Sequence, residues 1–204
     1  MRLTSLLKFS WAYNLSQYIF GAARLRRWFV HELLRPKPTD MLFEAGCGTG
    51  SLLDLMPPVQ SYFGYDISKD YIEAAQQRYP MHHFVATTGE DLLSLPPAPS
   101  DIVFCVGLLH HLNDDQVRAV IRLAVKNMKS GARFVALEPC YLRHQNQLSR
   151  FFISQDRGEF IRQESEYRSL LLESFEWVQQ DVVTGLNNLP YVHVAIEARS
   201  PRLA

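Results

Sequence analysis

The spacing of apolar residues divides this 204-residue chain into a helical N-terminal part and a longer part with mixed periodicity. Residues 5–34 carry apolar and aromatic side chains at helical spacing, which predicts two helices that meet near Gly21. Pro36 and Pro38 end this region. Beyond them, short apolar runs alternate with amphipathic stretches, a pattern typical of an α/β domain with helices on both faces of a sheet.

Seven apolar runs predict the strands, at 41–45, 62–65, 82–86, 102–106, 131–137, 176–183 and 191–199. Helices are expected over 50–56, after Ser68, from Asn113 or Asp114 to 128, and over 166–173. The loop 184–190 is rich in turn residues and short, so the last two strands should be antiparallel, because a parallel return needs a long crossover. Residues 140–164 show no regular pattern. We therefore expect a mostly parallel seven-stranded sheet with an antiparallel last strand.

The chain length favours a single domain, 1–204, which we divide into four parts. These are an N-terminal helical cap at 1–38, a core at 39–139, an insert at 140–165 and a C-terminal part of the sheet at 166–204.

Composition narrows the function classes. Basic and acidic residues are equal in number, 21 each, which argues against a nucleic-acid binder held mainly by phosphate contacts. The three cysteines are widely spaced and fit neither a disulfide framework nor a zinc site. The sequence shows no persuasive set of metal ligands, so we expect no metal. No apolar segment approaches the ~20 residues that span a bilayer, and no signal-peptide pattern is present. A cytoplasmic protein is expected, whereas the oligomeric state is not predicted.

A glycine-rich turn follows the first predicted strand. Glycines at 46, 48 and 50 let the chain turn sharply and let a nucleotide approach the backbone. A dinucleotide site needs G-x-G-x-x-G, and here Ser51 stands where the third glycine of that pattern would be. Asp66 ends the second predicted strand, and a carboxylate can accept two hydrogen bonds side by side.

The segment 44–50, Glu-Ala-Gly-Cys-Gly-Thr-Gly, resembles motif I of the class I S-adenosylmethionine (SAM) dependent methyltransferases, in particular small bacterial ones of type 11/12. Segments 64–68, 89–91, 100–112 with its LHHL ending and 128–134 resemble the later motifs of this family in order. The start of the first strand departs from the usual VLDIG, and Ser130 and Ala132 replace the usual proline and second glycine. The resemblance covers 41–139.

That resemblance implies a Rossmann-like class I methyltransferase fold that binds SAM and releases S-adenosylhomocysteine (SAH). The cofactor-binding residues that it implies are Glu44, Gly46, Cys47, Gly48, Gly50, Asp66, Ile67, Glu90, Asp91, Leu92, Gly107 and His111.

The acceptor should lie beyond the carboxyl ends of the parallel strands. Residues at this edge include Glu138, Pro139 and Cys140 after the fifth strand. Candidate catalytic groups are His110, His111, Tyr191 and His193, although the two adjacent histidines also suit a structural role. The insert resembles a lid over the acceptor, and its alternative is an ordinary surface excursion. Candidate substrate contacts are Tyr13, Gln17, Cys140, Asp156, Arg157 and Arg162. Cys140 also suits an inert buried thiol.

We expect a methyltransferase that acts on a small-molecule acceptor, by in-line displacement without a metal. A hydroxyl of a sugar-like or secondary-metabolite compound is the favoured acceptor. A quinone, another aromatic compound or a carboxylate is the alternative. Two other classes stay open, a SAM-binding partner without activity and an NAD-type oxidoreductase that uses Asp66 on its ribose.

Overall fold

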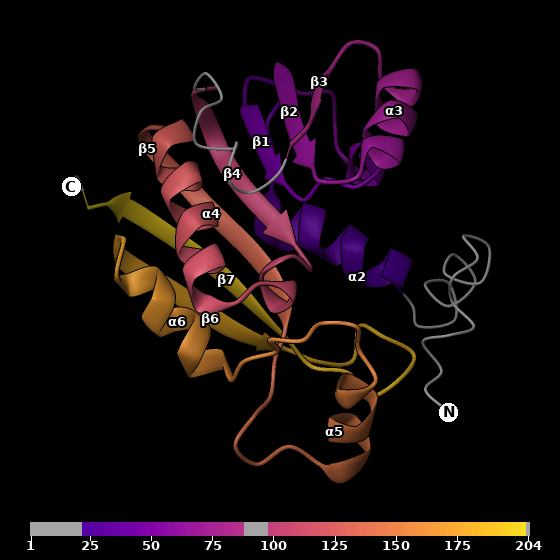
Figure 1. Cartoon of the computed structure of the whole chain (residues 1–204), viewed down its shortest axis with the longest axis vertical. Coiled ribbons are helices and arrows are strands. Elements are labelled where there is room, and N and C mark those ends of the chain that lie inside the picture. Colours follow the sequence, from indigo (N-terminus) through magenta and orange to yellow (C-terminus); the bar gives the residue numbers. More distant parts are fainter. Residues whose placement is uncertain (1–21, 88–97, 203–204) are drawn as a thin grey trace.

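The fold is a single twisted sheet with helices on both faces (Figure 1). The computed structural model describes residues 22–87 and 98–202. Within them the seven strands have the order β3-β2-β1-β4-β5-β7-β6. β7 is antiparallel to both β5 and β6, whereas the pairs among β1 to β5 are parallel. The strands are β1 (Met41–Ala45), β2 (Ser61–Asp66), β3 (His83–Ala86), β4 (Ser100–Val106), β5 (Met128–Pro139), β6 (Phe175–Val183) and β7 (His193–Pro201). The predicted fold class is confirmed.

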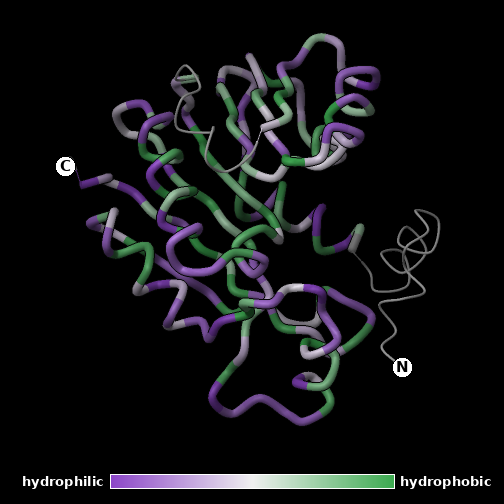
Figure 2. Tube along the Cα trace, viewed as in Figure 1, coloured by the Kyte–Doolittle hydropathy of each residue, from purple (hydrophilic) through white to green (hydrophobic). Residues whose placement is uncertain are grey.

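Alternation along the strands sends side chains into two hydrophobic layers. In β1, Phe43 packs into one layer and Leu42 into the other. The first layer lies under α4 (Asp114–Asn127) and α6 (Glu164–Leu172), and the second lies under α2 (Ala22–Trp28), the π-helical turn η2 (Phe29–Leu34) and α3 (Lys69–Arg78). The colours of Figure 2 follow this division, with hydrophobic residues along the central strands and hydrophilic ones on the outer turns of the helices.

The helix ends agree with the capping residues expected from the sequence. The Ser68 hydroxyl accepts from the backbone N–H of Tyr71 at the start of α3. Asn113 and Gln116 form a capping box at the start of α4, where each side chain accepts from the other's backbone N–H.

Two local predictions are wrong. The helix expected over 50–56 is only a 3₁₀ turn, η3 (Ser51–Leu55), because Pro57 forces Met56 into an extended conformation. The segment 140–164, expected to be irregular, contains α5 (Gln147–Ser154), capped by the Asn146 side chain. This helix buries little more than Ser149 and Ile153, and two positions are too few to produce a visible helical pattern.

Hydrogen bonds from two arginines connect the described part of the N-terminal region to the sheet and to the β6–β7 loop. Arg133 of β5 donates to the backbone carbonyls of Leu33 and Leu34 at the end of η2. Arg24 of α2 donates to the carbonyls of Gly185 and Leu186 in the β6–β7 loop, at 2.7 and 2.8 Å. The rest of the expected N-terminal cap, residues 1–21, lies outside the described residues.

The parallel pairing brings the carboxyl ends of four strands to one edge. Ala45 of β1 lies beside both Tyr65 of β2 and Cys105 of β4. At the end of β5, Pro139 lies beside His193, where the antiparallel β7 begins. The glycine-rich turn, Asp66, the two adjacent histidines and the start of β7 therefore share an edge. Among the described residues, no helix is long and apolar enough to cross a membrane.

Candidate active site

The glycine-rich turn wraps around the end of β2. The backbone N–H groups of Gly46 and Cys47 both donate to the Tyr65 carbonyl at 2.9 Å. Gly46, Gly48 and Gly50 have φ angles of 71°, 54° and 70°, a region that favours glycine. A Cβ built on Gly48 meets no atom of the described residues within 4 Å, so these residues leave open space in front of the turn. This geometry lets a ligand approach the backbone.

Asp66 is fixed beside that turn by two backbone donors. One carboxylate oxygen accepts from the N–H of Gly48 and the other from the N–H of Ser68, each at 2.9 Å. The carboxylate is only partly buried, and the neighbouring Ile67 is 75% exposed. Each carboxylate oxygen has a further lone pair for an incoming donor.

Glu44 lies beneath the turn, and within the described part of the chain its side chain forms no ion pair. Its side chain is buried and accepts a hydrogen bond from the Tyr62 hydroxyl. Burial raises the pKa of this carboxyl to about 8, although the Tyr62 hydrogen bond and the charge of Arg26 oppose the shift. Burial likewise raises the pKa of the Cys47 thiol. Both side chains are therefore neutral near pH 7.

Among the cofactor-binding residues predicted from the sequence, the glycine-rich turn and Asp66 have a geometry that suits SAM. The glycine-rich turn offers open backbone, and Asp66 offers a pre-aligned carboxylate of the kind that accepts from two ribose hydroxyls. Gly107, with a φ of 63°, turns the chain after β4 and donates to the Leu137 carbonyl. Glu90, Asp91 and Leu92 lie outside the described residues.

Glu138 organises the opposite half of this edge, at the end of β5. Its carboxylate is fully buried and accepts from the backbone N–H groups of Leu108 and Leu109, at 3.0 and 2.9 Å. It is also 2.7 Å from Nδ1 of His110. The turn η5 (Leu109–His111) is thus held to β5 by one carboxylate.

Asp156 of the insert approaches the same histidine from the other side. One Asp156 oxygen is 3.3 Å from Nε2 of His110 and accepts from the N–H of Gly158 at 2.8 Å. The other accepts from the Tyr191 hydroxyl at 2.5 Å. Burial opposes a charge on His110, but its hydrogen bonds to Asp156 and Glu138 prevail and raise its pKa to about 9. Burial also opposes a charge on Asp156, yet hydrogen bonds from His110 and Tyr191 hold its pKa well below the usual range.

The two other histidines favour the neutral form. The exposed ring of His111 lies 4.0 Å from the ring of His110, centroid to centroid. Desolvation and the neighbouring His110 lower the pKa of His111. His193 is buried beside Tyr191, and burial lowers its pKa to about 4. The structure thus brings together all four predicted catalytic residues, but in different charge states.

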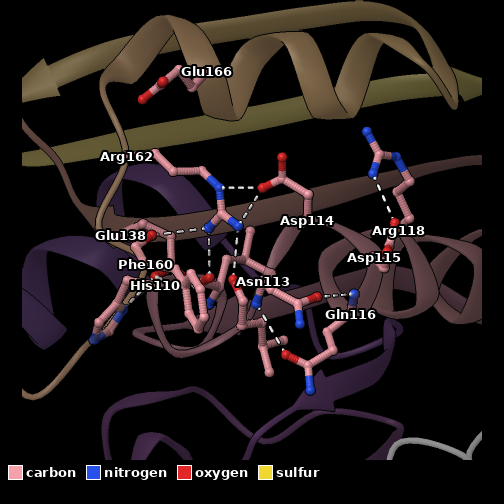
Figure 3. Close-up of polar contacts among 12 residues, drawn as sticks. His110, Asn113, Asp114, Asp115, Gln116, Arg118, Glu138, Phe160, Arg162 and Glu166 are labelled. Carbon is pink, nitrogen blue, oxygen red and sulfur yellow. Dashed lines mark hydrogen bonds and ion pairs between the residues drawn. The ribbon is translucent and has the colours of Figure 1, made fainter.

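Arg162 has a structural role that its assignment as a substrate contact did not anticipate. Its guanidinium donates to Asp114 and to the carbonyls of Leu109, Leu112 and Phe160, as Figure 3 shows. These contacts involve all three guanidinium nitrogens, and the side chain is buried. The N–H groups of Arg162 are therefore occupied within the protein and do not face a substrate. Arg162 instead joins the insert to η5 and α4.

The other predicted substrate contacts are dispersed. Cys140 is completely buried and burial raises its pKa to about 12, so it matches the inert thiol and not an acceptor contact. Arg157 is exposed on the insert, and Asp156 is in the His110 network. Tyr13 and Gln17 lie outside the described residues. The sequence did not single out Gly158, which packs directly on His110.

Comparisons with known proteins agree with this geometry. Residues 43–134 match the family model described as a methyltransferase domain. No curated protein matches the chain. A SAM-dependent methyltransferase from Archaeoglobus fulgidus has a similar structure, with a TM-score of 0.69, 18% identity and coverage of 92% of this chain and 99% of that one.

Two further solved structures are similar. Magnesium protoporphyrin IX methyltransferase from Synechocystis PCC 6803, solved with bound SAH, has a TM-score of 0.62, 20% identity and coverage of 88% of this chain and 83% of that one. The mitomycin 7-O-methyltransferase MmcR has a TM-score of 0.65, 17% identity and coverage of 88% of this chain but 54% of that one. The family match over residues 43–134 and the strand order support a class I SAM-dependent methyltransferase fold over the oxidoreductase alternative.

Proposed function

We propose that this enzyme methylates a hydroxyl group of a small molecule, and that His111 receives the hydroxyl proton. The observation that carries the proposal is the position of His111. It follows β4, which lies between β1 with its glycine-rich turn and β5 with Glu138. Of the residues in this network, His111 has an exposed imidazole whose pKa is lowered, so it can accept a proton at neutral pH.

The division of labour follows from the residues present. SAM, when bound, supplies a methyl group that is already activated for displacement. Asp66 and the glycine-rich turn hold the cofactor in one orientation, because Asp66 is itself fixed by two backbone donors. The remaining task of the protein is to align the acceptor and exclude water. The insert, which contacts His110 in the turn η5 after β4, suits that task.

The histidine favours a hydroxyl over a carboxylate acceptor. A hydroxyl must lose a proton on methylation, whereas a carboxylate needs no base. MmcR, by its name, methylates an oxygen, which is consistent with this choice. A sugar-like or secondary-metabolite hydroxyl is our preferred class, and a quinone or other aromatic compound is the alternative outcome of the acceptor test.

The cofactor half of the proposal is tested by calorimetry with SAH. Asp66→Ala should weaken SAH binding by about 1.5–3 kcal/mol, the value of hydrogen bonds to a charged group. Asp70→Ala is the matched control, because Asp70 is an exposed acid four residues further along. Equal affinities of the two variants would show that Asp66 is not the ribose acid. Absence of SAH binding to the wild type at millimolar concentration would overturn the proposed function.

The acceptor half is tested by transfer of labelled methyl groups from SAM to pooled metabolites. Compounds with a free hydroxyl should be labelled, and the same compounds with that hydroxyl already O-methylated should not. With an acceptor in hand, His111→Gln should lower kcat by roughly 10²-fold or more, as expected for loss of a general base. His144→Gln, an exposed histidine of the insert, is the control. Full activity of His111→Gln would contradict its role as proton acceptor.

A further inference from the structure

We propose that His110 is a positioning residue whose imidazolium clamps the insert (residues 140–165) to the sheet, and that it does not take the acceptor's proton. The clamp consists of Glu138, His110 and Asp156. Because it is built from contacts within the protein, the inference holds whichever acceptor the enzyme takes.

The sheet half of the clamp is rigid. Glu138 has no exposed surface, and the backbone N–H groups of Leu108 and Leu109 fix its carboxylate at the end of β5. That carboxylate then sets the orientation of the imidazole through the 2.7 Å contact with Nδ1. The ring of His110 is therefore held by β5 as well as by its own turn η5.

The insert half of the clamp contacts the same imidazole ring. Asp156 lies 3.3 Å from Nε2, and the N–H of Phe160 donates to the His110 carbonyl at 2.9 Å. Between them, Gly158 lies so close that a Cβ built on it would be 2.1 Å from Cδ2 of His110 and 2.8 Å from the His110 carbonyl oxygen. Only a glycine fits there, so residues 156–160 close over His110 as one unit.

The two carboxylates specify the charge of the ring. An imidazole donates from both nitrogens only when it is protonated, and each nitrogen here faces a carboxylate oxygen. The other titratable groups around the ring are His111 on the same turn, and His193 and Tyr191 at the start of β7, with Arg157 beside His111. The pKa of His193 is lowered to about 4 and that of Tyr191 is raised, so both side chains stay neutral. The charge of the His110 ring is therefore governed mainly by Glu138 and Asp156.

The clamp has two functional consequences. While it is closed, Nε2 of His110 carries a proton that is shared with Asp156, so this nitrogen does not accept one from a substrate. In addition, the clamp fixes the turn that carries His111, so the position of the insert and that of the proposed proton acceptor are coupled.

Tryptic cleavage after Arg157 reports on the clamp without any acceptor. The bond between Arg157 and Gly158 lies within the closed unit, and Gly158 N–H is held by Asp156. Asp156→Asn, which removes the charge but keeps the shape, should be cleaved there at least 10-fold faster than the wild type at pH 7.5, measured by mass spectrometry from initial rates. Gly158→Ala should be cleaved faster as well, because its Cβ displaces the insert from His110. Glu159→Gln, an exposed neighbour, should match the wild type.

A pH series separates a charged clamp from simple packing. The pKa of His110 is raised to about 9, so the ion pair with Asp156 is present below that pH and is lost above it. Wild-type cleavage after Arg157, corrected with a peptide substrate for the activity of trypsin, should therefore accelerate as the pH rises through about 9. In Asp156→Asn this acceleration should disappear.

Cleavage of Asp156→Asn at the wild-type rate, or fast cleavage of Gly158→Ala alone, would overturn the charged clamp in favour of packing. Calorimetry with SAH on each variant shows that it is folded, since the glycine-rich turn is remote from the insert in sequence. Should Asp156→Asn fail to bind SAH while the wild type binds it, His110→Gln replaces it in the cleavage assay with the same expected rate. Failure of the wild type to bind SAH would refute the proposed function and leave the cleavage result intact.

Discussion

Two buried glutamates at the same edge of the sheet, Glu44 and Glu138, differ in the hydrogen-bond donors that surround their carboxyl groups. Glu44, at the cofactor side, accepts one hydrogen bond from the Tyr62 hydroxyl, and its burial raises the pKa to about 8. Glu138, at the proposed acceptor side, accepts from three backbone N–H groups and faces a histidine. Burial without strong donors favours the neutral form of a carboxyl, and this is the situation of Glu44, whereas Glu138 has several donors in contact.

This difference separates the two halves of the active site. The floor of the glycine-rich turn is neutral, with Glu44 protonated and Cys47 as a thiol. The proposed acceptor side is a network of contacts that begins at Glu138, passes through His110 and ends at Asp156. The neutral half relies on backbone geometry, and the charged half relies on ion pairs that join distant segments. Substitutions in the two halves should therefore change stability and SAH affinity in different ways.

The largest effect is expected from Glu138→Ala. It removes a buried carboxylate and leaves the N–H groups of Leu108 and Leu109 and the ring of His110 without their acceptor. The free energy of unfolding should fall by about 3–5 kcal/mol, the cost of breaking a buried pair by removing one partner. Urea denaturation at pH 7 measures it. Asp181→Ala, an exposed acid on β6, is the control, and a loss below 1 kcal/mol for Glu138→Ala would mean that the network contributes little stability.

The contrast between the halves also explains what the sequence could predict. The glycine-rich turn is local, because strand, turn and acid follow one another within 41–66, and each residue type has its own steric or hydrogen-bonding reason. The strands were found for the same reason, since an apolar run shows itself in a few neighbouring residues. Ser68 and Asn113 caps were likewise visible in the sequence.

The acceptor side depends on pairings that no local pattern shows. Glu138 meets His110 across 28 positions, and Asp156 meets Tyr191 across 35. Arg162 was predicted as a substrate contact because a charged residue in a lid-like insert can serve as a polar anchor. Its partners, Asp114 and the carbonyls of η5, lie about 50 positions away and appear only in the fold. The sequence therefore predicted the members of this network but not their connections.

A second prediction tests the neutral half. The pKa of Glu44 is near 8 in the folded protein against an ordinary value of 4.5, so the folded state holds this proton more tightly than the unfolded state. Stability should therefore decrease as the pH rises from about 4.5 to 8. Glu44→Gln should remove that decrease, and its gain over the wild type should be about 4 kcal/mol larger at pH 8.5 than at pH 5.

Thermal unfolding across this pH range provides the measurement. Glu73→Gln, an exposed acid on α3, should keep the wild-type profile. Tyr62→Phe sharpens the test, because it removes the hydrogen bond that lowers the pKa of Glu44. The decrease in stability should then extend to higher pH. A wild-type profile for Glu44→Gln would show that Glu44 is ionised in the folded protein.

The smallest effect on stability is expected from Gly48→Ala, and it is the most specific for the cofactor half. Gly48 has a φ of 54° but open space around its Cα, so alanine suffers backbone strain without a clash, a cost of about 1–2 kcal/mol. Its methyl group points into the space through which we propose SAM approaches, so SAH affinity should fall more than stability does. Gly158→Ala should do the reverse, since its φ is unremarkable and its clash is with His110. Unfolding and SAH calorimetry on both variants decide the matter: if Gly48→Ala kept its SAH affinity, the open face of the turn would not be where the cofactor binds.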